Sequence, residues 1–188
     1  SGEEAAGELT TAEGMTLIED IARAGFQIMI FSGGEPLLRP DIFDLIHHAR
    51  EVGLRPVLGT NGTLLTLETA RALKDAGLMA AGISLDSLDA AAHDRLRGQQ
   101  GAWQAAVNGM QHCRAVGLPF QIHTTVMDWN ADEICAITDF AVEIGARAHH
   151  IFFLVPTGRG EDIEYQALER HAYENVLTRI MNKAKNVP

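Results

Sequence analysis

Residues 27–39 read QIMIFSGGEPLLR, and this stretch decides the fold. The apolar run of residues 28–31 predicts a short strand, which leads directly into Ser32, two glycines, Glu35 and Pro36. Two adjacent glycines carry no Cβ atom, so the backbone can adopt positive φ there or approach a ligand closely. A strand that ends in such a turn, beside a carboxylate, predicts a binding site at the turn.

The alternation of strand and helix continues along the whole chain. Apolar runs predict strands at 27–31, 56–59, 80–85, 120–127 and 148–155, and amphipathic segments predict helices at 11–24, 41–52, 66–76, 90–96, 103–116, 131–144 and 165–185. The strands are continuous apolar runs, which is typical of strands buried on both faces, so we expect a parallel sheet. The prediction is an α/β fold, a partial β/α barrel with outer helices, in a single domain over residues 1–188.

Composition excludes several classes of function. Of the 188 residues, 25 are acidic and 15 basic, and this balance argues against a nucleic-acid partner because phosphate contacts need clustered positive charge. No run of 18 apolar residues predicts a membrane span, and the acidic start does not resemble a signal peptide, so we expect a cytoplasmic protein. Cys113 and Cys135 lack partners at metal-ligand spacing, so we expect them to be buried, small apolar side chains.

Polar side chains follow each predicted strand, where ligands bind in parallel α/β folds. The groups are residues 32–35, Thr60 and Asn61, Ser84 and Asp86, Asp128 and Asn130, and residues 157–159. Several of them also have a purely structural interpretation. Asn61 can belong to a turn, Asp86 can cap the next helix and Arg97 can be a solvated helix end. His123, inside a strand, is more typical of a packed histidine than of a ligand.

Glu35 has the most specific chemistry of these candidates. A carboxylate beside two glycines can accept hydrogen bonds from an ammonium group, while the exposed backbone pairs with polar atoms of the same ligand. This combination suits an amino-acid moiety. A phosphate cradle would instead need a lysine, and the Walker pattern is absent.

Residues 31–39, FSGGEPLLR, resemble the GGEP motif of radical S-adenosylmethionine (SAM) enzymes, which binds the methionine amino group of SAM. The resemblance implies a partial (β/α)6 barrel with SAM as cofactor. It places Ser84 and Asp86 at the methionine carboxylate and ribose, and residues 152–154 beside the adenine. The cofactor-binding residues that it implies are Ser32, Gly33, Gly34, Glu35, Pro36, Thr60, Asn61, Ser84, Asp86, Arg97, Val126, Asn130, Phe152 and Leu154.

Two further segments, GELTTAE at 7–13 and FFLVPTGRG at 152–160, look most like the radical SAM enzymes of haem d1 formation and of siroheme-dependent haem biosynthesis. This resemblance implies an enzyme that reductively cleaves SAM at a [4Fe-4S] cluster. The 5′-deoxyadenosyl radical would then modify a tetrapyrrole side chain, with flavodoxin or ferredoxin as electron donor. Three alternatives stay open: a maturase acting on a peptide or on a molybdenum-cofactor precursor, a cluster-less SAM-binding or scaffold domain, and an unrelated partial-barrel enzyme.

The chain departs from the family pattern at its cysteines. Family members carry CxxxCxxC just upstream of the first helix, where three thiolates hold the cluster, but no cysteine precedes Cys113 here. Relatives also continue into a cysteine-containing C-terminal region. We therefore expect that both cluster-bearing ends are missing from this chain and that the chain alone is inactive.

Overall fold

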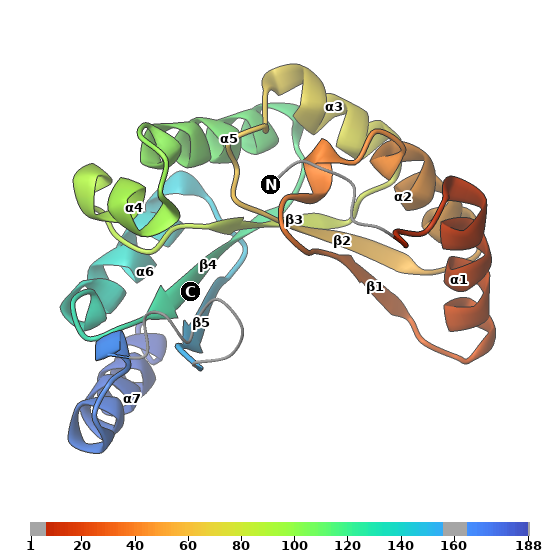
Figure 1. The fold of residues 1–188 in the computed structure, drawn as a ribbon. Coiled ribbons are helices and arrows are strands. Elements are labelled where there is room, and N and C mark those ends of the chain that lie inside the picture. Colours follow the sequence, from red (N-terminus) through yellow and green to blue (C-terminus); the bar gives the residue numbers. More distant parts are fainter. Residues whose placement is uncertain (1–6, 156–164, 188) are drawn as a thin grey trace. The chain divides into compact units, whose positions relative to one another are not determined.

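The computed structural model describes residues 7–155 and 165–187 of the chain (Figure 1). Its internal contacts divide the chain into two compact units. The first unit consists of residues 1–83 and 105–120, and the second of residues 84–104 and 121–188. The chain therefore passes from one unit to the other three times.

The predicted helices and strands are all present in the described part of the chain. The helices are α1 (Thr11–Arg23), α2 (Ile42–Glu51), α3 (Leu67–Asp75), α4 (Ala90–Arg97), α5 (Ala102–Val116), α6 (Ile134–Ile144) and α7 (Arg170–Ala184). The strands are β1 (Ile28–Phe31), β2 (Arg55–Thr60), β3 (Ala80–Ser84), β4 (Phe120–Val126) and β5 (His149–Phe153). Two 3₁₀ turns, η1 (Pro36–Leu38) and η2 (Ala131–Glu133), precede α2 and α6. The largest difference from the prediction is at α7, which begins five residues later than expected.

The sheet is parallel, as the apolar strands predicted. Its strand order is β1-β2-β3-β4-β5. In the first unit, Ile30 pairs with Val57 and Leu58 with Ala81, while in the second unit β4 pairs with β5. Parallel pairing brings the carboxyl ends of neighbouring strands to one edge, so the loops after β1 and β2 begin beside each other.

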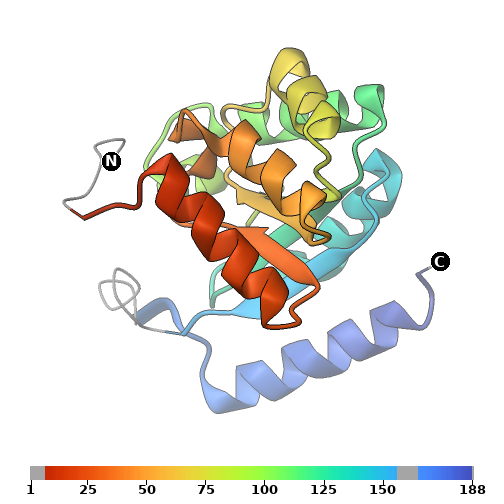
Figure 2. The ribbon, with the colours of Figure 1, turned by 90° about the vertical axis from the view of Figure 1, so that its right-hand side faces the viewer.

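The helices of the first unit form one layer on its strands. Thr10 and Glu13 form a capping box that starts α1, because each side chain bonds the other's backbone N–H. Helix α1 packs against α2, and α2 packs against both β2 and α3 (Figures 1 and 2). The core contains the buried side chains of Ile18, Ile46, Leu58, Leu73 and Ile83.

In the second unit, helices α6 and α7 pack together. Arg179 of α7 donates to the Asp132 carboxylate at 2.7 Å. Helix α4 is capped by Asp89, whose carboxylate accepts from the backbone N–H groups of residues 91 and 92, so Asp86 is not a helix cap. Over residues 7–155 and 165–187, no helix has the length and apolar character to cross a membrane.

We expect Gly109→Ala, inside α5, to lower the free energy of unfolding. A Cβ atom at Gly109 would lie 2.9 Å from Leu65 Cβ and 3.2 Å from the carbonyl oxygen of Gly62. Such overpacking costs about 1–3 kcal/mol.

The matched control is Gly14→Ala in α1, where the new Cβ would lie 3.2 Å from the movable end of Leu45. Urea unfolding of both variants measures the difference. A Gly109→Ala variant as stable as Gly14→Ala would contradict the tight contact between α5 and the loop after β2.

Candidate functional site

The Glu35 carboxylate joins the loops that follow β1 and β2. Its Oε1 accepts from the Thr60 hydroxyl at 2.8 Å and from the Leu37 N–H at 3.2 Å, and its Oε2 accepts from the Asn61 N–H at 2.8 Å. Glu35 is half-buried, and the parallel register of β1 on β2 places Thr60 within its reach. The structure thus brings together three residues that the sequence predicted for the site.

The loop after β2 is fixed by its own hydrogen bonds. The Thr60 hydroxyl accepts from the Gly62 N–H at 3.1 Å, and Asn61 Oδ1 accepts from the Thr63 N–H at 2.8 Å. Gly62 has φ of +82°, and a Cβ there would lie 2.9 Å from Ala106 Cα, so only glycine fits. The donors that hold Glu35 are therefore rigidly placed.

The two glycines before Glu35 border open space. Chain neighbours apart, a Cβ atom at Gly33 or Gly34 would meet no atom of residues 7–155 and 165–187 within 4 Å, and Gly33 has φ of +145°. Ser32 and both glycines are exposed, and Pro36 starts the 3₁₀ turn behind them. A carboxylate with two oxygens has about four lone-pair positions, and three are used here. The turn therefore has room for a cation, and Glu35 keeps one acceptor position for it.

Arg39 ties the segment before α1 to the end of this turn. Its guanidinium donates to the carbonyl oxygen of Leu9 and to Asp41, each at 2.9 Å. Burial would raise the pKa of Asp41, but the bonds from Arg39 and Thr11 outweigh it, so this pKa lies below its usual value. A carboxylate that stays ionised keeps this connection intact at neutral pH.

In the second unit, Asp86 is a fully buried carboxylate with every oxygen engaged. Its Oδ2 accepts from Arg97 Nε at 2.9 Å and from Arg97 Nη2 at 2.6 Å, and its Oδ1 accepts from the Thr125 N–H at 3.0 Å. The Arg97 side chain is 31% exposed. Asp86 therefore holds the guanidinium in place, and Arg97 is the member of the pair that meets solvent.

His93 lies against the same carboxylate but stays neutral. Burial lowers the pKa of His93, and its Nδ1 accepts from the Asp86 N–H at 3.2 Å. The proton is therefore on Nε2, which is buried and has no hydrogen-bond partner within the described ranges. His93 consequently stabilises the Asp86 backbone and does not pair with its charge.

Asn130 and Glu133, after β4, hold the loop that carries Asp86. The buried Asn130 amide donates to the carbonyl oxygens of Asp86 and Thr125, at 2.8 and 2.9 Å, and accepts from the Met127 N–H. Glu133 accepts from the Ser87 hydroxyl and from the Leu88 N–H. The sequence did not single out Glu133, although its spacing of three from Asn130 is typical of paired loop and helix-start residues.

Three more of the predicted site residues belong to the second unit and lie in β4, in β5 or directly after β5. Val126 is fully buried, whereas Phe152 is 51% exposed and Leu154 is half-buried. Ser84 is half-buried at the end of β3. The predicted cluster at 157–159 lies outside the described residues.

The described chain has no residues for an iron–sulfur cluster. Cys113 is buried, and burial raises the pKa of its thiol to about 12, so it remains protonated. Cys135 is half-buried. Among residues 7–155 and 165–187, no group of three or more His, Cys, Asp or Glu side chains could hold a metal ion. The prediction of buried cysteines is therefore confirmed for Cys113, whereas Cys135 is only half-buried.

His149 faces away from the exposed side of β5 and is held between two threonines. Its Nε2 lies 2.9 Å from the Thr124 hydroxyl, which donates to the carbonyl oxygen of Leu85, and its Nδ1 lies 2.9 Å from the Thr138 hydroxyl. Burial and the neighbouring His150 and His123 lower the pKa of His149 to about 4. The imidazole is therefore neutral, with its proton on Nε2, and its Nδ1 lies beside a Thr138 hydroxyl that also donates to the carbonyl oxygen of Ile134 at 2.9 Å.

Known proteins resemble this chain in sequence. The sequence pattern of the radical SAM superfamily matches residues 1–141. The chain is 45% identical over 172 residues to an AdoMet-dependent heme synthase of Methanosarcina barkeri, covering 92% of this chain and 49% of that protein. It is 36% identical over 180 residues to an Fe-coproporphyrin III synthase of the same organism, covering 96% and 45%. It is 32% identical over 187 residues to a PqqA peptide cyclase of Methylocella silvestris, covering 92% and 50%.

Solved structures share the fold. SuiB of Streptococcus suis, bound to its precursor peptide SuiA, superposes with a TM-score of 0.78 at 18% identity, covering 98% of this chain and 42% of SuiB. SuiB bound to S-adenosylmethionine superposes with a TM-score of 0.76 at 18% identity, covering 96% and 43%. These similarities confirm the predicted partial radical SAM barrel. The chain spans about half the length of the curated relatives that it matches.

We expect Asn130→Asp to destabilise the second unit. The new carboxylate oxygen would replace the NH₂ group and face the carbonyl oxygens of Asp86 and Thr125. Each buried acceptor left without a donor costs about 1–3 kcal/mol. Thermal unfolding would show a lower midpoint than for Asn182→Asp, the matched change at an exposed position of α7. Equal midpoints would contradict the network around Asn130.

We expect His149 to make stability depend on pH. The unfolded chain takes up a proton at His149 below its usual pKa of 6.5, whereas the folded protein takes it up only near pH 4. The contribution of His149 is therefore complete above pH 6.5 and is lost as the pH falls from 6.5 to 4.

Urea unfolding at pH 7.5 and 4.5 measures this loss. His149→Gln should lose less stability between the two values than the wild type, while His171→Gln, at an exposed position of α7, should lose as much as the wild type. Identical losses in His149→Gln and the wild type would contradict the buried neutral imidazole.

Proposed function

The chain belongs to the radical SAM superfamily, and we propose that it is the core of an enzyme that binds SAM and modifies a side chain of a tetrapyrrole. The observation that carries the substrate class is the 45% identity to an AdoMet-dependent heme synthase over 92% of this chain. The chain spans about half of that relative, so the proposed activity belongs to the whole protein.

The Glu35 turn fits the amino end of SAM. We propose that the SAM ammonium group donates to the free acceptor position of Glu35, while Thr60 and Asn61 hold the carboxylate through their bonds of 2.8 Å. The open space beside Gly33 and Gly34 leaves room for the methionine moiety. Since the donors to Glu35 are already in place, binding requires no rearrangement of this loop.

In the second unit, we propose that Arg97 contributes to cofactor binding, as the resemblance implies. Asp86 already uses Arg97 Nε and Nη2, which leaves Nη1 to donate to a ligand. Asp86 then acts by orienting Arg97. The other proposed cofactor-binding residues keep the roles that the resemblance implies; they are Ser84, Val126, Asn130, Phe152 and Leu154. We propose that Asn130 acts through the loop that it holds.

The cluster that the family implies does not fit residues of this chain. Iron–sulfur clusters of this type are held by thiolates, and the sequence contains only two cysteines. The thiolates for such a cluster are therefore not among these 188 residues. We propose flavodoxin or ferredoxin as the electron donor.

When bound, SAM would supply the chemistry, because one-electron reduction would break one of its carbon–sulfur bonds and give a carbon radical able to remove a hydrogen atom from the substrate. The residues of this chain bind and orient. Glu35 fixes the amino group, and Arg97 offers a cation held in one direction by Asp86. Positioning of this kind is the protein's main contribution when a cofactor carries the reaction.

A peptide substrate is the second candidate. The 32% identity to a PqqA peptide cyclase, over 92% of this chain, favours it. It comes second because the identity to the peptide cyclase is lower than the 45% identity to the heme synthase.

We expect Glu35→Gln to weaken SAM binding. The change keeps the shape of the side chain but removes the charge that an ammonium group needs. A hydrogen bond to a charged group contributes about 1.5–3 kcal/mol, so the dissociation constant should rise about 10- to 100-fold.

Isothermal titration of the chain with SAM measures this change. Glu68→Gln, at the exposed start of α3, is the matched control and should bind like the wild type. Equal affinity of Glu35→Gln and the wild type would contradict the role of Glu35. Consumption of SAM by the whole protein, supplied with its cluster and a reductant, separates an enzyme from a scaffold.

A further inference from the structure

One face of the second unit's strands presents two histidines and a phenylalanine. His123 of β4 and His150 of β5 are register partners, and Phe152 follows His150 by two residues on the same face. We call His123, His150 and Phe152 the histidine face. Because strand residues alternate between faces, His149 and Phe153 lie on the opposite face.

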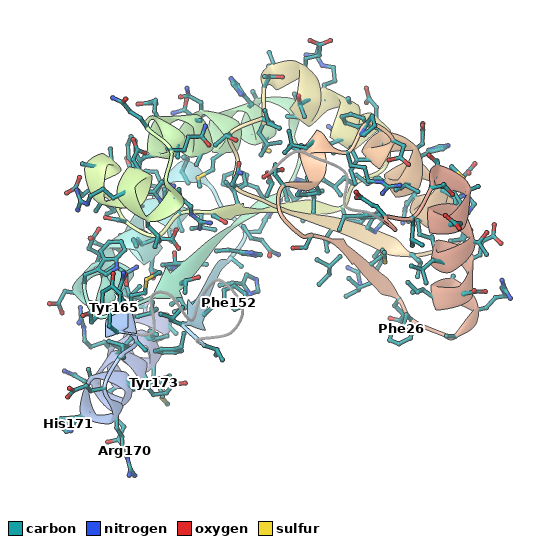
Figure 3. The ribbon with its side chains drawn as sticks, viewed as in Figure 1. Phe26, Phe152, Tyr165, Arg170, His171 and Tyr173 are labelled. Carbon is teal, nitrogen blue, oxygen red and sulfur yellow. The ribbon has the colours of Figure 1, made fainter. Side chains whose placement is uncertain are left out.

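The opposite face is the one that the helices cover. Thr138 of α6 bonds His149, and Tyr173 of α7 packs on Phe153 with ring centroids 4.1 Å apart. On the histidine face, His150 is exposed, Phe152 is 51% exposed and His123 is half-buried. Figure 3 shows Phe152 projecting from β5. The histidine face therefore offers two imidazoles and a benzyl ring to a ligand.

The rings of the histidine face are packed in a defined arrangement. His123 meets both His150 and Phe152 edge-on, with centroids 5.2 and 5.4 Å away. His150 and Phe152 are nearly parallel, with an angle of 19° between their planes. His123 thus supports the other two rings from the side. Burial, together with His150, lowers the pKa of His123, so this support is uncharged at neutral pH.

The histidine face is incomplete as a site for a bare metal ion. Protein zinc sites use at least three side-chain ligands, and the described part of the chain has no such group. An iron tetrapyrrole has a different requirement, because the macrocycle supplies four nitrogens and the protein adds only axial ligands, most often a histidine. One accessible imidazole is sufficient for it.

Resting on the proposed tetrapyrrole substrate, we propose that the histidine face binds an iron tetrapyrrole, with His150 as the axial ligand of the iron. An axial imidazole stands upright on the macrocycle. Since Phe152 is nearly parallel to His150, it meets the same macrocycle with its edge, which is a favoured aromatic geometry. His123 is a positioning residue that keeps His150 upright.

The test is titration of the chain with ferric coproporphyrin III at pH 8, above the usual histidine pKa of about 6.5. Absorption and electron paramagnetic resonance spectra report whether a histidine ligates the iron. We expect the wild type and His171→Ala to show histidine ligation. His171, also labelled in Figure 3, is exposed on α7 in the same unit and is the matched control.

The variants separate ligation from binding. His150→Ala should lose the histidine-ligated spectrum and regain it when free imidazole is added. Phe152→Ala should keep the spectrum but bind about two- to tenfold more weakly, as expected for one lost aromatic contact. Metal-free coproporphyrin should bind His150→Ala as well as the wild type, because it has no iron to ligate.

The outcomes distinguish this inference from the proposed function. If the iron tetrapyrrole binds but its spectrum is the same in the wild type and His150→Ala, the axial role of His150 is wrong and the tetrapyrrole substrate stands. If neither the iron nor the metal-free tetrapyrrole binds to the chain, the inference that the histidine face binds a tetrapyrrole is wrong. SAM titration of the same protein then tests the cofactor part of the function separately.

Discussion

The hydrogen bonds of the Glu35 carboxylate are the constraint on which the first unit's site depends. They bridge two loops that are 25 residues apart in the chain and adjacent only because β1 and β2 are parallel. A charged acceptor between two strand ends satisfies the Asn61 N–H and the Thr60 hydroxyl at once. The same carboxylate links the two loops and is the group that we propose to bind the SAM ammonium. The geometry of the site therefore depends on the pairing of the strands.

The second unit uses a carboxylate differently. Asp86 is fully buried, and its partner Arg97 is the part that reaches solvent. Moving Arg97 away would leave the buried Asp86 charge unpaired, which is strongly destabilising. The Arg97 guanidinium is therefore held in one place. Asn130 and Glu133 then fix the loop around this pair from the next strand's end. Polar residues at strand ends can therefore act as ligands or as the supports of ligands.

Sequence patterns predicted the parallel sheet from the apolar strands and the alternation of helix and strand, and they predicted that polar residues at the strand ends gather at one edge. They could not show that Asp86 faces Arg97, since that depends on loop conformations and side-chain rotamers. Nor could they show that His123 lies beside His150. That contact depends on the register of two strands joined by a long crossover, and a shift of one residue would place His149 there instead. The sequence favoured a packed role for His123, and its half-buried ring is consistent with that interpretation.

The division of the chain into two units has a practical consequence for dissecting the protein. The first unit is not a continuous segment, because it needs residues 105–120 as well as residues 1–83. Gly62 and Leu65 pack directly on α5, at Ala106 and Gly109. A truncation after β3 would therefore expose the loop that holds Glu35, and the shortest piece that keeps this loop supported extends to the end of α5. Between the two segments it must also carry residues 84–104, so the Glu35 turn cannot be isolated from the Asp86 loop by cutting the gene.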